Sequence, residues 1–279
     1  MYTRIHLAML TAMLFFLPAI GPAGSRTRAR EEPTPRPSAR EAGPSRAMLI
    51  EARNLAYDAN FRNDQSGLRS AIAAIDPLAG KAEVASYAHY YLAWTYWMLV
   101  ASQIEEKDMT AALESATRAL EHARAGVATR AGDSEFQTML ANALVANGIL
   151  DRARFKALWA ELATVRKKAL ALGPKNPRAV MMDAGIIYWA PPDQGGGRET
   201  GLARWDQAAR LFEAEASVPS DDPLAPRWGY ALYHGWSANL YLSMTPPLMA
   251  RAKSAADAAL ALRPDFWYVR ERVLPKLRE

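Results

Sequence analysis

Residues 250–265 read ARAKSAADAALALRPD, and this stretch decides the fold. In an α-helix Ala252, Ala256 and Ala259 occupy positions i, i+4 and i+7, so they share one face. Small side chains on one face allow a second helix to approach closely. Pro264 cannot continue a helix, because proline lacks the backbone N–H and clashes with the preceding turn. The stretch therefore predicts a helix that packs closely against a neighbour and ends before residue 264.

The same helix ending occurs further upstream. Residues 169–174 read ALALGP, and residues 259–264 read ALALRP. Pro174 and Pro264 are 90 residues apart, and Pro219 lies midway between them, after another helical run. A fixed interval of this size is typical of stacked helical arrays.

The pattern Ala-x-x-x-Ala-x-x-Ala-x-x-x-x-Pro at 252–264 resembles the second helix of a tetratricopeptide repeat (TPR). Its alanines recur at Ala112, Ala116 and Ala119. The interval of 45 residues exceeds the roughly 34 of an ordinary TPR and is near the roughly 40–47 of HEAT units. The alanine pattern favours TPR, with lengthened helices; the alternative is a chance coincidence in an alanine-rich chain.

The fold class predicted for the chain is all-α, a TPR-like α-solenoid of about five antiparallel helix pairs with a C-terminal capping helix. Valine and isoleucine are sparse beside alanine and leucine, which also favours helix. Helix pairs are expected at 47–61 with 66–76, 84–103 with 108–125, 134–147 with 151–172, 177–189 with 198–216, and 225–244 with 248–263. Asn147-Gly148 is the expected turn of the third pair. Residues 266–277 are expected to cover the last pair, as the end of an array requires.

Residues 1–23 have the features of a secretory signal peptide. Arg4 precedes an apolar run from Leu7 to Leu17, and small residues lead to a cleavage site after Ala23. The run is too short for a membrane span, so we expect export without a transmembrane span in the mature chain, and a periplasmic location if the host is Gram-negative. The alternative is an uncleaved membrane anchor.

Residues 24–46 are predicted to form a disordered Pro/Arg-rich linker, because they contain no large apolar residue. The TPR-like helical repeat domain would then cover residues 47–279. Most of the formal charge of +5 lies before residue 47, so the domain itself is nearly neutral. We therefore expect no binding to nucleic acid.

Catalytic and metal-binding motifs are absent from the sequence. It contains no cysteine, and its four histidines show no ligand spacing. The glycines at 195–197 precede a helix but lack the lysine of a phosphate-binding loop, so a tight turn is favoured over an anion site. We predict no catalytic residue, no metal and no cofactor.

Aromatic residues on the first helix of each pair are the candidate ligand-binding residues. In TPR proteins these helices line the concave groove, and tyrosine and tryptophan offer an apolar face with a polar tip. The candidates are Tyr87, Tyr91, Trp94, Tyr188, Tyr230 and His234. The alternative for each residue is packing between helices.

The resemblance implies a non-catalytic, exported scaffold that binds a peptide, a protein partner or a small ligand in its groove. Two alternative activities remain open, besides an array that has no ligand groove and acts by dimerisation. One is a solute-binding accessory protein of a transport system, with an enclosed, aromatic-lined cavity. The other is a helical enzyme, which would require carboxylates or histidines that converge in one cleft. An open groove favours the scaffold, and a closed apolar pocket favours the solute-binding protein.

Overall fold

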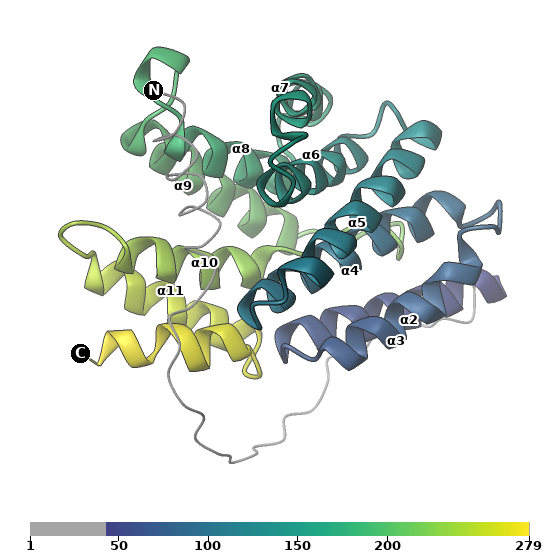
Figure 1. Cartoon of the computed structure of the whole chain (residues 1–279). Helices are drawn as coiled ribbons and strands as arrows, with labels where there is room; N and C mark the ends of the chain where they lie inside the picture. The colour runs from purple at the N-terminus through teal and green to yellow at the C-terminus, as the bar shows by residue number, and fades with distance from the viewer. Residues whose placement is uncertain (1–42, 279) are drawn as a thin grey trace.

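The computed structural model describes residues 43–278, which form helices and no β-strand (Figure 1). The α-helices are α2 (Pro44–Phe61), α3 (Gln65–Ile75), α4 (Ala85–Glu105), α5 (Met109–Thr129), α6 (Ser134–Leu150), α7 (Phe155–Leu172), α8 (Pro177–Trp189), α9 (Arg198–Ala216), α10 (Tyr230–Leu242) and α11 (Met249–Leu262). Short 3₁₀ turns are η2 (Asp76–Leu78), η3 (Pro192–Gln194) and η5 (Pro275–Leu277), and η4 (Val269–Val273) is a π-helical turn. Consecutive α-helices pair into five hairpins, as predicted. The predicted signal peptide lies outside the described residues.

The alanine spacing that predicted the fold is confirmed as a packing device. Each hairpin packs the second helix closely against the first, and in α5 and α11 the alanine face of that second helix is buried. The fully buried alanines are Ala112, Ala116, Ala119, Ala252, Ala256 and Ala259. In α9 a glycine takes the first of these positions: a Cβ at Gly201 would lie 2.4 Å from the Cα of Tyr188. Backbones therefore approach most closely where the sequence supplies its smallest residues.

Side-chain caps begin several helices where the sequence indicated a start. The carboxylate of Asp108 accepts a hydrogen bond from the backbone N–H of Ala111 at 3.0 Å. Asp64 caps α3 in the same way, and Asn176 caps α8 after the turn at 173–176. Each cap satisfies a backbone N–H that would otherwise lack a partner in the first turn.

The third and fifth pairs differ from the prediction in two places. Asn147-Gly148 is not a turn: α6 runs through it to Leu150, because buried Asn147 donates to Thr117 Oγ1 at 3.3 Å and is held by packing. The first helix of the fifth pair begins at Tyr230 instead of residue 225. Residues 217–229, called the closing segment below, form an irregular connection with a turn at 222–225.

The closing segment is not helical because of its own residues. It contains Pro219, Pro223 and Pro226, and Gly229 has a φ of 114°, in the left-handed region that favours glycine. Leu224 and Trp228 are nonetheless buried. The closing segment therefore packs into the core, where it contacts α4.

Two chain ends differ in detail from the prediction. Helix α2 begins at Pro44, so residues 44–46 of the predicted linker are helical. The tail is helical and buries Val269 and Val273, as a cap would. It differs from the predicted helix because it consists of a π-helical turn followed by a 3₁₀ turn.

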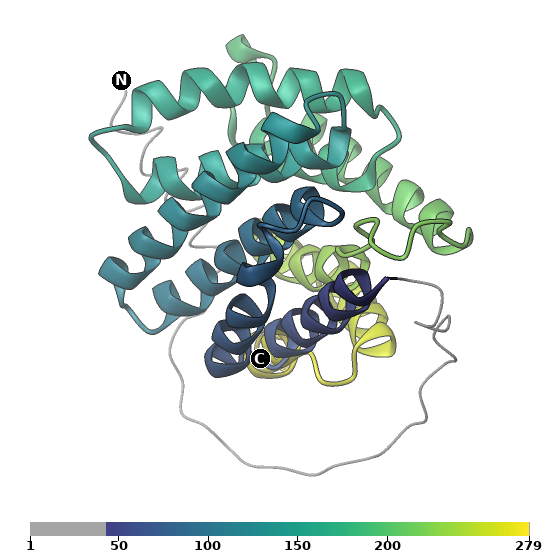
Figure 2. The ribbon, with the colours of Figure 1, turned by 90° about the vertical axis from the view of Figure 1, so that its right-hand side faces the viewer.

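The array curls until its last segment contacts its first helix pair (Figure 2). Arg263 pairs with Asp58 of α2 at 3.2 Å, and the rings of Phe61 and Phe266 meet edge to face with centroids 4.9 Å apart. The side chain of Arg272 forms a largely buried ion pair with Glu105 at the end of α4. The chain therefore closes on itself, which an open superhelix does not do.

Candidate functional site

The first helices of the second to fifth pairs face a common interior. On α6 the residues Asn142, Val145, Ala146 and Ile149 follow helical spacing along this face. Corresponding stripes of α4, α8 and α10 oppose them, and the tail covers one side. Together they surround a cavity of about 270 Å³ that is predominantly apolar, called the inner pocket below.

Tryptophan dominates the wall of the inner pocket. Six of the eight tryptophans of the chain line it: Trp97, Trp159, Trp189, Trp205, Trp236 and Trp267. Five of these are only partly buried, whereas Trp205 is buried and its indole N–H donates to Ser237. A concave, apolar cavity with aromatic walls and few polar groups is the usual form of a small-molecule site. Aromatic rings also supply a large contact area at low cost in conformational entropy.

The polar groups on the wall are few. Glu105 is the one charged residue among those that line the inner pocket in the described part of the chain, and it is paired with Arg272. Burial raises the pKa of Glu105, and the arginine opposes this rise. Asn142 and Asn239 present side-chain amides from α6 and α10. The pocket therefore offers neutral hydrogen-bonding groups and no unpaired positive charge for an anion.

Of the six residues proposed from the sequence, the structure brings Tyr188 to the inner pocket. Tyr87 is buried, and its hydroxyl donates to Asp222 at 2.8 Å. Tyr91 is fully buried and donates to the carbonyl of Leu224 at 2.7 Å.

The three remaining candidates also lie away from the inner pocket. Trp94 is 1 % exposed and packs edge to face against Tyr57. Tyr230 and His234 are partly buried and contact each other, with ring centroids 4.8 Å apart. All three rings therefore pack between helices in this structure.

The face of α4 that lies inward is one step round the helix from the predicted stripe. Tyr87, Tyr91 and Trp94 face the closing segment, while Trp97 and Met98 face the inner pocket. Because α4 is apolar on nearly every face until Glu105, periodicity does not distinguish the two stripes. The sequence did contain one signal that these first helices are buried on most sides. Helix α10 contains no charged residue, and α4 has none before its last position.

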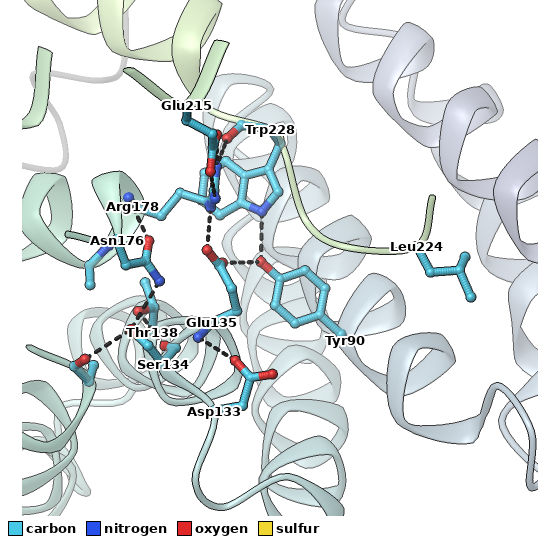
Figure 3. A network of polar contacts seen from close by, with 12 residues as sticks. Tyr90, Asp133, Ser134, Glu135, Thr138, Asn176, Arg178, Glu215, Leu224 and Trp228 are labelled. Carbon is cyan, nitrogen blue, oxygen red and sulfur yellow. Dashed lines mark hydrogen bonds and ion pairs between the residues drawn. The ribbon is translucent and has the colours of Figure 1, made fainter. Parts of the chain in front are cut away.

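A buried polar network fixes the closing segment (Figure 3). Arg178 of α8 is 2 % exposed, and its Nε donates to Glu135 of α6 at 2.7 Å. Its Nη1 donates both to Glu215 of α9, at 2.9 Å, and to the backbone carbonyl of Trp228, at 2.8 Å. The indole N–H of Trp228 donates to Tyr90 of α4 at 2.7 Å. One guanidinium thus joins three helices to the closing segment.

The electrostatics of this network indicate a structural role. Burial disfavours the charged form of Arg178, but Glu135 and Glu215 outweigh this and raise its pKa. Burial also raises the pKa of Glu135, against the effect of the arginine. All three nitrogens of the guanidinium donate hydrogen bonds within the protein, so the network fixes the chain in place.

The other features examined from the sequence have structural explanations. The glycines at 195–197 form a tight turn: Gly195 and Gly197 have positive φ, and the N–H of Gly197 donates to Ile187 of α8. His89 and His122 contact each other through their Nδ1 atoms at 3.1 Å, and burial lowers the pKa of both. Within residues 43–278, no three histidine or acidic side chains lie where they could hold a metal ion. In that span no helix is long and apolar enough to cross a membrane.

Comparisons with known proteins agree with this architecture. No family model matches the sequence, and no curated protein matches it. Among solved structures, the chain resembles a thermophilic TPR protein of Thermus thermophilus, with a TM-score of 0.51 and 18% identity. The match covers 83% of this chain and 100% of the other. At this identity the likeness concerns the fold alone: the chain has a TPR-like helical repeat fold.

Proposed function

We propose that this protein is a non-catalytic binding protein whose inner pocket holds a predominantly apolar ligand. The observation that carries the proposal is the concentration of six tryptophans around one cavity of about 270 Å³. Five of them keep part of their surface open to it. Large apolar surfaces left open inside a protein usually mark a binding site, because their burial by a ligand is favourable.

The closure of the array favours a compact ligand over a long peptide. The contacts of Arg263 with Asp58 and of Phe266 with Phe61 join the two ends of the array. A TPR-like fold commonly serves as a scaffold for protein interactions, and an apolar side chain from a partner protein would enter the same pocket. Of the alternatives drawn from the sequence, the partly enclosed cavity with aromatic walls favours the solute-binding protein. We further propose export, on the strength of residues 1–23.

A pocket-filling substitution tests the proposal. Gly185 of α8 lines the inner pocket, and a Cβ at this position meets no atom within 4 Å. Gly185→Leu should therefore fill part of the cavity without a backbone clash. Gly80→Leu is the matched control, because Gly80 also has open space around it but lies in an exposed turn away from the pocket.

The assay is a titration of the full chain with N-phenyl-1-naphthylamine, a neutral dye that fluoresces in apolar surroundings. We expect wild type and Gly80→Leu to bind it alike, and Gly185→Leu to bind it at least about tenfold more weakly, a loss of ~1.4 kcal/mol. Failure of wild type to bind would refute the proposal. Equal binding by Gly185→Leu would show that the dye occupies another site, and would refute it as well. Cell fractionation of the native host tests export, since recovery of the uncleaved protein in the cytoplasm would contradict it.

A further inference from the structure

One side chain of the inner pocket is polar, nearly buried and without a partner. Asn142 lies near the middle of α6 and is 8 % exposed. Its helical neighbours Val145, Ala146 and Ile149 line the same cavity, so its side chain is on the stripe that faces inward. Among the residues that the structure describes, neither the amide N–H₂ nor the amide oxygen of Asn142 makes a hydrogen bond.

Ser102 and Tyr188 of this wall also have hydroxyls without a hydrogen bond, and the hydroxyl oxygen of Ser102 is fully buried. Three other polar side chains are already engaged. The carboxylate of Glu105 is paired with Arg272. The amide oxygen of Asn239 accepts a hydrogen bond from Lys276 at 3.5 Å. The indole N–H of Trp205 donates to Ser237 at 2.7 Å. Asn142 therefore differs from these three in having both a donor and an acceptor available.

Asparagine with an unpaired side-chain amide is unfavourable at position 142. Buried polar groups normally have hydrogen-bond partners, and asparagine is a weak helix former compared with leucine. A leucine at residue 142 would suit the surrounding Val145 and Met181 better. Because nothing in the fold uses the amide, a bound ligand or solvent in the pocket must satisfy it.

The chemistry of the amide indicates the kind of ligand. An asparagine side chain donates through its N–H₂ group and accepts through its oxygen, so it pairs edge to edge with another amide. It carries no charge, and neither an unpaired cation nor an unpaired anion lies beside it in the described wall. The tryptophans would contact the apolar body of the same molecule.

We propose that Asn142 is the polar anchor of the inner pocket, and that the ligand is a neutral, mainly apolar molecule that carries a carboxamide or lactam group. The inference rests on the proposed function, because it assigns a ligand class to the same pocket. The proposal predicts that a ligand with an amide group binds more tightly than one without it, and that this preference is lost when Asn142 is replaced.

The test uses two competitors of equal ring size, 2-naphthamide and 2-methylnaphthalene, which displace N-phenyl-1-naphthylamine from the full chain. We expect wild type to bind 2-naphthamide about tenfold or more tightly than 2-methylnaphthalene, since two hydrogen bonds form in an apolar site. Asn142→Leu should remove this preference and leave the affinity for 2-methylnaphthalene unchanged or improved. Asn142→Ala, which introduces no bulk, repeats the test if the leucine variant fails to fold.

The outcomes separate this inference from the proposed function. If the dye binds, Gly185→Leu blocks it, and both competitors bind wild type and the Asn142 variants alike, the anchor is refuted and the pocket proposal stands. Equal weakening of both competitors by Asn142→Ala would also refute the anchor, because it would show a packing role. If the dye does not bind wild type at all, the proposed function fails, and the inference fails with it.

Discussion

The substitution Arg178→Met tests how the closing segment is held in place. It removes a buried guanidinium and leaves Glu135 and Glu215, whose side chains are 16% and 25% exposed, without their cation. Removal of one partner from a buried ion pair costs about 3–5 kcal/mol, because the remaining charge is uncompensated. Loss of the hydrogen bond to the carbonyl of Trp228 adds about 1 kcal/mol. We therefore expect a loss of about 4–6 kcal/mol of unfolding free energy.

Urea unfolding, followed by circular dichroism, measures this loss. Hydrogen exchange should also show that the backbone amides of residues 224–229 become less protected, because the closing segment should detach before the helices unfold. The control is Arg118→Met, because Arg118 and Glu121 form an exposed pair that contributes about 0–1 kcal/mol.

A triple variant separates charge imbalance from general loss of packing. Arg178→Met combined with Glu135→Gln and Glu215→Gln removes all three charges, so it should recover most of the stability lost in the single variant. The reasoning is refuted if Arg178→Met costs less than about 1 kcal/mol, or if the triple variant is no more stable than the single one.

Two further predictions concern helix packing and pH. Gly201→Ala should destabilise the protein by about 1–3 kcal/mol, because its Cβ would meet the backbone of Tyr188 at 2.4 Å. Gly185→Ala lies in open space and should be neutral or stabilising by up to about 1 kcal/mol. Thermal melts of both variants check this difference, and equal melting temperatures would contradict it. Burial lowers the pKa of His89 and His122, so the unfolded chain takes up protons first as the pH falls through about 6.5, and stability should decrease from there toward the lowered folded-state pKa values. His122→Gln should reduce this decrease in unfolding free energy, measured by urea titrations between pH 7 and 5. An unchanged pH dependence would contradict its attribution to these histidines.

The local architecture could be predicted from the sequence. Helix spacing placed Ala252, Ala256 and Ala259 on one face, because this pattern depends on residues within a few positions of each other. The second helix of the second pair also begins where it was predicted, at the cap that Asp108 provides. The same reasoning predicted the five helix pairs, with both helices of the fourth pair at their observed bounds.

All six candidate residues lie on helices that line the inner pocket, but only Tyr188 lines it among the residues that the structure describes. Trp94 and Trp97 are three positions apart on a helix that is apolar all round, so periodicity gives neither of them preference for the interior. Asn142 carried no signal at all, since an isolated asparagine in a helix is ordinary. Its significance appears only when its burial and its lack of a partner are known.

The closure of the array could not be predicted from the sequence. The contacts that close it join residues far apart in sequence, such as Arg272 with Glu105 and the closing segment with Arg178. No local pattern encodes such pairs, because the two partners lie 50 or more positions apart in the sequence. They arise when the curvature of the stacked pairs brings the two ends of the array together, and that curvature encloses the inner pocket and sets which residues line it.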